Sequence, residues 1–296
     1  MKTITEKSLQ KVLLLALFPV FLFSCGQSSQ NENFLSEIGI CTSVDNHAKM
    51  NEHGYTFIEE GLLRFLKPLE PHESFLPNFE KAQNAEIPVY ATNLFLPGHL
   101  KAVGEEPMHD QIIAYADTAF RRAEMIGIKR VVFGSSGSRR IPEGFDRDLA
   151  RGQFIDLLKK LGPVAQKYDV VIIIEPLNSR EVNFINTSLE GLSIVKETNH
   201  PNIQLLVDIF HMMRENEPPS NILEAEGYIK HVHVAEFENR TAPGTAGDDF
   251  TPYLKALLDI DYQGAISIEG RWDDFDAQLP VAIATLKEQI QRVKEM

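Results

Sequence analysis

The sequence predicts a closed barrel of eight parallel strands alternating with helices, the (β/α)8 or TIM-barrel fold. Strand-like and helix-like runs alternate from Glu37 to the C-terminus, which is typical of a parallel sheet wrapped by helices. Several strand-like runs are apolar throughout, as expected for strands buried on both faces. Residues 35–296 contain no Pro/Gly/Ser-rich linker, and such barrels commonly use roughly 250 residues for one domain. A doubly wound open sheet is the alternative, but no glycine-rich dinucleotide motif follows the first strand.

The first 24 residues have the features of a bacterial lipoprotein signal peptide. Lys2, Lys7 and Lys11 precede an apolar run, Val12–Phe23, that is too short to cross a bilayer as a helix. The run ends in Leu-Phe-Ser-Cys-Gly, which resembles a lipobox and implies cleavage before Cys25 and acylation of its thiol. Residues 25–34, rich in Ser, Gln and Asn, are predicted to form a flexible tether before the barrel of residues 35–296. We therefore expect a cell-envelope lipoprotein on the periplasmic side, whose contact with the membrane is through the lipid; which membrane carries it stays open.

Eight runs have the composition of strands, with β-branched and aromatic residues bounded by turn residues. They are Glu37–Thr42, Thr56–Glu59, Pro88–Asn93, Arg130–Gly134, Val170–Glu175, Ile203–Asp208, His231–Ala235 and Ala265–Glu269. Five segments between or after them carry apolar residues at helical spacing. They are Gln111–Ile126, Phe154–Tyr168, Ser188–Thr198, Thr251–Leu258 and Leu279–Val293. In the first helix Ile112, Ala116, Ala119 and Ala123 share one face, which predicts a stripe turned toward the core.

Strands five to eight each end on a side chain that can bind a metal. These side chains are Glu175, Asp208, His233 and Glu269. Because the active sites of (β/α)8 barrels lie at the carboxyl ends of the strands, we expect the four to meet above the barrel. Three carboxylates so close would repel one another and raise their pKa values, and a divalent cation removes that repulsion. The alternative for any one of them is a structural group that is paired inside the core.

The predicted ligand set is rich in oxygen and contains a single histidine. Such a set suits manganese, cobalt or magnesium better than a structural zinc, which prefers Cys and His. We expect one divalent ion, with Mn²⁺ favoured and Co²⁺, Mg²⁺ or Zn²⁺ as alternatives. His231 faces the same way as His233 but lies one layer deeper. We therefore expect His231 to support the ligands rather than to be one of them.

Four residues beyond the strand ends are candidates for substrate binding. His211 comes just past strand six, and Glu181 and Arg240 follow strands five and seven on their loops. Trp272, the only tryptophan, follows strand eight and could form an apolar wall against a sugar face. The alternatives are a loop histidine bonded to the backbone, solvated loop charges, and a tryptophan that covers the barrel rim.

Charge and cysteine content narrow the partners. A net charge of −13 repels phosphate backbones, which argues against nucleic acid as a substrate. With Cys25 acylated, Cys41 has no second cysteine for an intramolecular disulfide, and its apolar neighbours predict a small buried side chain. The expected partner is a small carbohydrate, and the assembly state stays open, a homo-oligomer included.

Four motifs together resemble the xylose isomerase-like barrel superfamily, and in particular its ketose 3-epimerase branch. They are EPLNSRE from Glu175, LVDIFHM from Leu206, HVHVAE from His231 and ISIEG from Ile266. The segment GYTFIEEG, which begins at Gly54, fits the same pattern. The resemblance covers the chain from about Glu37 to its end.

The resemblance implies roles for the candidate residues. The four strand-end side chains would bind the metal, and Glu175 and Glu269 would also transfer protons. Glu181, His211 and an arginine after strand seven would hold the substrate. Arg240 is the candidate for that arginine, although the arginine of the epimerases comes one residue earlier. The superfamily also includes inosose dehydratases and endonuclease IV; the latter needs more His ligands than these loops provide and a surface that attracts DNA.

These features predict an enzyme that removes the proton next to a sugar carbonyl. A metal bound to the carbonyl would act as a Lewis acid and stabilise the enediolate, and a carboxylate would take the proton. Epimerisation, isomerisation and elimination share that intermediate. Because sugar phosphates are scarce outside the cytoplasm, we expect an unphosphorylated substrate and favour a 3-keto-glycoside 1,2-lyase in glycan breakdown. A ketose 3-epimerase or aldose-ketose isomerase is the alternative, and a non-catalytic sugar-binding lipoprotein is a third hypothesis.

Overall fold

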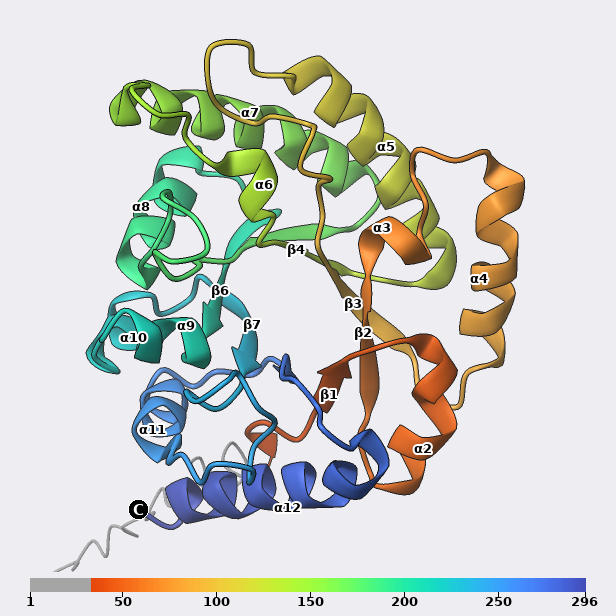
Figure 1. The fold of residues 1–296 in the computed structure, drawn as a ribbon, viewed down its shortest axis with the longest axis vertical. Coiled ribbons are helices and arrows are strands. Elements are labelled where there is room, and N and C mark those ends of the chain that lie inside the picture. Colours follow the sequence, from red (N-terminus) through yellow and green to blue (C-terminus); the bar gives the residue numbers. More distant parts are fainter. Residues whose placement is uncertain (1–32) are drawn as a thin grey trace, which may run out of the picture.

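The computed structural model describes residues 33–296 and shows the expected barrel (Figure 1). Eight parallel strands pair in sequence order, and β1 closes the ring by pairing with β8. The strands are β1 (Ile38–Cys41), β2 (Phe57–Gly61), β3 (Val89–Asn93), β4 (Arg130–Phe133), β5 (Val171–Ile174), β6 (Ile203–Asp208), β7 (Ile229–Val234) and β8 (Ile266–Ile268). All eight overlap the predicted runs, so the fold prediction is confirmed.

Helices form the outer layer around the strands (Figure 1). A 3₁₀ turn, η1 (Val44–Asn46), and the short helices α2 (His47–Glu52), α3 (Leu62–Phe65), α6 (Ser136–Arg139), α9 (Ile209–Arg214) and α10 (Ser220–Glu224) lie next to strand ends or in connections. The longer helices are α4 (His72–Asn84), α5 (His109–Ile126), α7 (Arg147–Lys167), α8 (Ser188–Thr198), α11 (Thr251–Asp259) and α12 (Phe275–Lys294). The five predicted helices are present, and α4 was not predicted.

Two helices start earlier than their apolar pattern because an aspartate caps each of them. Asp146 accepts a hydrogen bond from the backbone N of Leu149 at 2.8 Å, so α7 begins at Arg147. Asp274 accepts one from the backbone N of Ala277 at 3.1 Å, so α12 begins at Phe275. Such caps satisfy backbone N–H groups that the first turn of a helix leaves free.

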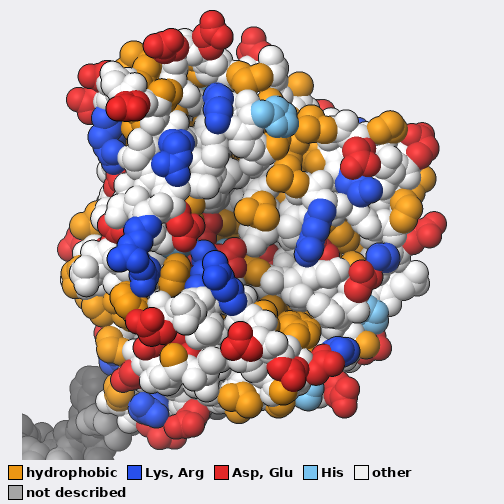
Figure 2. All heavy atoms as spheres, viewed as in Figure 1, with side chains coloured by type: hydrophobic (Ala, Val, Ile, Leu, Met, Phe, Trp, Pro, Cys, Tyr) orange, Lys and Arg blue, Asp and Glu red, His pale blue; other side chains and the backbone are white. Residues whose placement is uncertain are grey.

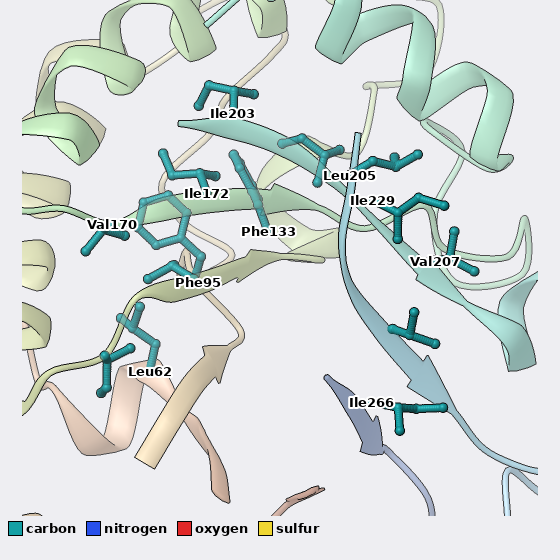
Figure 3. Packing of buried hydrophobic residues seen from close by; sticks show 14 of the residues in the cluster. Leu62, Phe95, Phe133, Val170, Ile172, Ile203, Leu205, Val207, Ile229 and Ile266 are labelled. Atoms are coloured by element: carbon teal, nitrogen blue, oxygen red, sulfur yellow. The ribbon is translucent and has the colours of Figure 1, made fainter. Parts of the chain in front are cut away.

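Alternation along the strands sorts side chains into two layers. Ile172 and Ile174 of β5 belong to the large core between strands and helices, and Figure 3 shows part of this core. Ile173 points the other way and packs with Val132 and Leu206 in the interior of the barrel. With this two-residue period, the next inward position after Ile173 is 175. Strand periodicity therefore turns the strand-end residues toward the barrel axis.

The predicted signal peptide, the acylated Cys25 and most of the predicted tether lie outside the described residues. Phe34, which the prediction placed at the end of the tether, has its side chain buried in the core. Within residues 33–296, no helix combines the length and the apolar character needed to cross a bilayer.

Candidate active site

The four predicted strand-end residues meet at the carboxyl end of the barrel. Glu175, Asp208, His233 and Glu269 each offer one ligand atom, and these atoms lie within 4.8 Å of one another. The Nδ1 atom of His233 is 3.2 Å from Oε1 of Glu175 and 3.2 Å from Oε2 of Glu269. Four consecutive strands, β5 to β8, therefore place three carboxylates and one imidazole around a common point.

Burial and mutual charge shift the ionisation of this cluster. Burial, followed by the negative charge of Glu269, raises the pKa of Glu175. Burial also acts to raise the pKa of Glu269, but the positive charges of Arg240 and His233 outweigh it and hold that pKa at about 2. The pKa of His233 lies well above its usual value, because the attraction of Glu59 and Glu269 exceeds the effect of burial. The two glutamates are thus pushed in opposite directions, as in paired acid and base groups.

Glu59, which sequence reasoning did not single out, fixes the orientation of His233. This fully buried carboxylate of β2 accepts hydrogen bonds from Nε2 of His233 at 3.0 Å and from Nε2 of His231 at 2.8 Å. The hydroxyl of Ser267 donates to it at 2.7 Å. Holding Nε2 in this way leaves Nδ1 of His233 turned toward the cluster. His231 lies deeper, at the supporting position that the strand period predicts.

A glycine at the end of β4 makes room for Glu175. A Cβ atom on Gly134 would lie 1.7 Å from Oε2 of Glu175 and 2.8 Å from its Cδ. These separations are far below any van der Waals contact, so any other residue at position 134 would displace the glutamate. The absence of a side chain at position 134 is therefore a condition for the observed position of Glu175.

His211 and Glu181 lie beside the cluster and are joined by Asn178. The amide Nδ2 of Asn178 is 2.9 Å from Oε1 of Glu181 and 2.9 Å from Nδ1 of His211. Since the backbone N of Asn178 donates to the same Nδ1 atom at 3.2 Å, the proton of a neutral His211 belongs on Nε2. That Nε2 atom lies 3.5 Å from Oδ2 of Asp208 and has no hydrogen-bond partner within the described part of the chain.

Arg240 reaches the cluster directly. Its Nη2 atom lies 3.3 Å from Oδ2 of Asp208 and forms an ion pair with Oε2 of Glu269, while its Nε donates to the backbone O of Glu269 at 3.0 Å. Its Nη1 atom is 3.6 Å from Oε1 of Glu181. Trp272, by contrast, packs edge-on against Phe275 with ring centroids 5.1 Å apart and does not line the cavities described below.

Two further residues from the first strands border the cluster. The amide of Asn93 donates to Oε1 of Glu269 at 2.9 Å. Cys41 is half-buried at the end of β1, and its sulfur lies close to ligand atoms of His233 and Glu269. Its position at the barrel mouth differs from the predicted place in the apolar core, because the strand ends at Cys41 itself. Burial, together with the charges of Glu59 and Glu269, raises the pKa of the Cys41 thiol.

Comparison with known proteins identifies the family. Residues 48–296 match the family described as xylose isomerase-like TIM barrel. The chain belongs to this family.

Named relatives of this xylose isomerase-like barrel include sugar epimerases and a putative hydroxypyruvate isomerase. The L-ribulose 3-epimerase of Methylomonas sp. is 35% identical over 120 residues, which cover 40% of this chain and 42% of that protein. A putative hydroxypyruvate isomerase of Mus musculus is 33% identical over 141 residues, 45% of this chain and 51% of the relative. The 3-dehydro-D-guloside 4-epimerase of Escherichia coli is 30% identical over 131 residues, 44% of this chain and 49% of the relative. The chain thus spans about half the length of the curated relatives it matches.

Solved structures share the fold of this xylose isomerase-like barrel. The D-allulose 3-epimerase of Methylomonas sp. superposes with a TM-score of 0.73 at 22% identity, covering 86% of this chain and 96% of the other. The 3-keto-D-glucoside 4-epimerase of E. coli gives a TM-score of 0.70 at 20% identity, covering 85% and 99%. A structure described as IOLI protein with a binding zinc atom gives 0.67 at 21% identity, covering 87% and 98%.

The cluster of this family member has the donors of a divalent-metal site. Its carboxylate oxygens and the Nδ1 atom of His233 converge within 4.8 Å, and a metal that binds there would displace the proton which the carboxylates hold on Nδ1. Glu59 holds the other imidazole nitrogen, which is the usual support of a metal-binding histidine. Oxygen donors with one nitrogen suit a hard or borderline divalent ion. The residues therefore fit a divalent ion, without distinguishing which one.

A cavity of about 580 Å³ opens beside the cluster. Its wall includes Asn178, Glu181 and Arg240, which contact the cluster or its neighbours, and the aromatic rings of Phe210 and Phe237. Figure 2 shows Lys and Arg side chains gathered at the edge of the central hollow, on the side where Figure 1 places α9 and β7. A second cavity of about 280 Å³ lies on the side of β1 to β3 and is lined in part by Cys41, Glu59 and Asn93.

Proposed function

We propose that this protein is a divalent-metal-dependent enzyme that removes the proton next to the carbonyl of an unphosphorylated sugar. The observation that carries the proposal is the convergence of three carboxylates and one imidazole within 4.8 Å at the mouth of the barrel. Its relatives named as sugar isomerases and epimerases support the same class of chemistry.

The chain's own residues supply the proton transfers and the orientation of the substrate. Glu175, Asp208, His233 and Glu269 would hold the metal, which when bound supplies Lewis-acid stabilisation of a developing oxyanion. Glu175 and Glu269 approach the same Nδ1 atom of His233, each at 3.2 Å, so two carboxylates are placed to take up and return a proton.

Hydrogen-bonding groups at the edge of the cluster would hold the sugar hydroxyls. His211 presents its Nε2 atom, which lacks a hydrogen-bond partner among the described residues. Glu181 and Arg240 border the cavity with half-exposed side chains. The free imidazole donor and these charged groups can fix the carbonyl carbon next to the proton-transferring carboxylates, which is how positioning lowers a barrier.

We propose elimination as the outcome, with a 3-keto-glycoside as the substrate. The C2–H bond breaks and its proton passes to a carboxylate, giving an enediolate across C2 and C3. The C1–O bond then breaks, a C1=C2 double bond forms, and the departing oxygen takes a proton, so the aglycone leaves as an alcohol. Relatives named for 3-dehydro-D-guloside and 3-keto-D-glucoside support a keto-glycoside as the substrate class.

Epimerisation or isomerisation of a free ketose is the second candidate. It is favoured by the relatives named L-ribulose 3-epimerase and D-psicose 3-epimerase. Return of the proton to the other face of the same carbon would then replace loss of the aglycone. We further propose that the enzyme is a lipoprotein of the cell envelope, acylated at Cys25, which would bring it to glycan-derived sugars rather than to sugar phosphates.

The test is a paired incubation in deuterated water. The manganese-loaded protein is mixed with a 3-keto-glucoside in one sample and with fructose or psicose in the other. Release of the aglycone, abolished by a chelator and by Glu269→Gln but not by Glu226→Gln at an exposed control position, is the expected result. Deuterium in a C3 epimer without cleavage would overturn elimination in favour of the epimerase. A purified protein without metal that binds an intact glycan tightly would identify a sugar-binding lipoprotein instead.

A further inference from the structure

The cavity of about 580 Å³ beside the cluster is lined by four arginines, although the protein as a whole is acidic. We call it the arginine cavity; the four are Arg180, Arg214, Arg240 and Arg271. Two glutamates, Glu181 and Glu238, share its wall. A net charge of −13 for the chain makes this local excess of positive charge a specific feature of the cavity.

Three of these guanidinium groups have no carboxylate partner. Arg240 is neutralised by Asp208, Glu269 and Glu181. Among residues 33–296, by contrast, no ion pair or side-chain hydrogen bond engages the guanidinium groups of Arg180, Arg214 or Arg271. Glu181 is already paired with Arg240, so Glu238 is the one other carboxylate in the cavity wall. The three unpaired arginines therefore leave the cavity with a surplus of positive charge.

Aromatic packing holds one of the three in place. The guanidinium of Arg214 lies over the ring of Phe237 at 4.5 Å and over that of Phe210 at 6.0 Å from the ring centroids. Stacking of this kind uses the face of the guanidinium and leaves its N–H groups, which lie in the plane, free to donate. A planar fork of donors fits the paired oxygens of a carboxylate or sulfate group.

The arginine cavity adjoins the reaction site through residues that contact both. Arg240 belongs to its wall and contacts Asp208 and Glu269 of the cluster. Asn178 also lines it and bonds to His211 at 2.9 Å. A molecule whose reacting carbon lies at the cluster can therefore extend into the cavity.

We propose that the arginine cavity binds an anionic substituent of the substrate, a carboxylate or a sulfate ester carried by the sugar or by the group attached to it. The substrates would then be acidic keto-glycosides, such as uronides or sulfated glycosides, rather than neutral ones. This inference rests on the proposed function for the reacting end of the molecule and adds the recognition of its charged end.

Binding of non-reacting probes tests the subsite without any turnover. Methyl β-D-glucuronide, methyl β-D-glucoside 6-sulfate and methyl β-D-glucoside are compared by calorimetry on the metal-loaded protein at low and high salt. We expect at least one anionic probe to bind about tenfold more tightly than the neutral one at low salt, with the preference reduced at high salt. The glucuronide and the sulfate distinguish the two sources of negative charge. Equal binding of all three probes would overturn the proposal.

Charge-matched variants locate the effect. Arg180→Gln and Arg271→Gln change exposed side chains, as does Arg121→Gln on α5, which lies outside the arginine cavity. We expect the first two, and more strongly their double variant, to lose the preference for the anionic probe while Arg121→Gln keeps it. An equal loss in all variants would mean a general effect of net charge and would contradict a specific subsite.

Turnover separates this inference from the proposed function. A 3-keto-glucuronide should be cleaved with a kcat/KM about tenfold above that of the 3-keto-glucoside with the same aglycone. Cleavage of both at the same rate would overturn the anion subsite and leave the lyase intact. A retained preference for anionic probes, with no turnover of either keto-sugar, would overturn the lyase and leave the subsite intact.

Discussion

Glu59 holds the histidine of the cluster from a strand that contributes no ligand. Its carboxylate receives three donors, from His231, His233 and Ser267, in a fully buried position. An amide of the same shape cannot accept all three, because one of its two ends carries N–H groups. The orientation of the His233 nitrogen that faces the cluster therefore depends on a residue 174 positions away in the sequence.

Replacement of Glu59 tests this dependence. In Glu59→Gln the new amide opposes at least one donor, so the imidazole of His233 loses its fixed orientation. We expect the affinity for Mn²⁺ to fall roughly 10- to 100-fold, measured by calorimetric titration, while circular dichroism still reports a folded barrel. Glu52→Gln, an exposed change on α2, serves as the control and should bind the ion like the parent protein. An unchanged affinity in Glu59→Gln would contradict the supporting role.

Gly134 gives a second test at the level of one residue. A methyl group at this position would overlap Oε2 of Glu175, 1.7 Å away, so Gly134→Ala must move that carboxylate. We expect kcat to fall about 100-fold, since a shift of roughly 1 Å at a catalytic group has effects of that size. Overpacking should also lower the free energy of unfolding by about 1 to 3 kcal/mol.

A matched glycine separates the two effects. Gly152→Ala on α7 meets no atom within 4 Å and lies in a helix, where alanine is favoured over glycine. This control should keep its activity and gain about 0.5 to 1 kcal/mol in urea unfolding. Full activity in Gly134→Ala would show that Glu175 can move without consequence. That result would contradict its proposed role in proton transfer.

At the level of elements, the sequence predicts all eight strands, and each element or contact that it did not predict has a physical explanation. Runs such as Val170–Glu175 combine a β-branched apolar stretch with one terminal charge, so both the strand and its functional end are visible in the sequence. Helix α4 was missed because it contains Pro77 and buries a single residue fully, Phe75. The helix is amphipathic, but few of its residues are apolar, so its stripe was overlooked.

The part of the site that comes from β1 to β3 was missed for a different reason. Glu59 was missed although the predicted run Thr56–Glu59 ends on it, because its partners His231 and His233 are more than 170 residues further along the chain. Such pairing follows from closure of the barrel, which no local pattern records. The carboxylate at the end of the predicted run Thr56–Glu59 was the signal that was available, as it was for strands five to eight.

The loop after β7 depends on one buried carboxylate. Glu236 is fully buried and accepts hydrogen bonds from the backbone N of Gly244 at 2.8 Å and of Gly247 at 3.0 Å, and it also bonds to Ala246 and Thr241. The backbone of this loop, which Glu236 holds in place, positions Arg240 against the cluster. A structural carboxylate in this loop thus fixes the position of a residue that borders the reaction site.

Glu236→Gln tests the role of this loop. An amide leaves at least one backbone N–H facing another donor, and an unmet buried hydrogen bond costs about 1 to 3 kcal/mol. We expect that loss in denaturant unfolding, together with faster amide exchange over residues 237–247 and a lower kcat/KM. Glu238→Gln, an exposed change in the same loop, should leave stability and exchange rates near those of the parent. Equal exchange rates in the two variants would argue that the loop is held by other contacts.

At the scale of the whole molecule, the metal would join the last four strands of the barrel, β5 to β8. Ligands from β5, β6, β7 and β8 lie within 4.8 Å of one another, and three of them are carboxylates that repel when nothing lies between them. An ion that binds the folded barrel but not the unfolded chain stabilises it by about 2.7 kcal/mol at a concentration of 100 times its Kd. For a domain of this size, that energy corresponds to a rise in Tm of roughly 5 °C or more.

Metal addition and removal therefore measure whether the cluster acts as one site. We expect the chelated protein to melt at least roughly 5 °C below the Mn²⁺-loaded protein in differential scanning calorimetry, and the shift to vanish in Asp208→Asn. Ser220→Ala on α10, remote from the ligand set, should keep it. Repeating the titration with Co²⁺, Mg²⁺ and Zn²⁺ ranks the ions. The imidazole nitrogen of His233 favours Mn²⁺ over Mg²⁺, and the oxygen donors predict that Zn²⁺ gains less than at a Cys-rich site. If the protein melts at the same temperature with and without each of these ions, Arg240 and His233 alone hold the carboxylates apart. The proposed removal of a proton next to a carbonyl would then lack the metal as its electrophile.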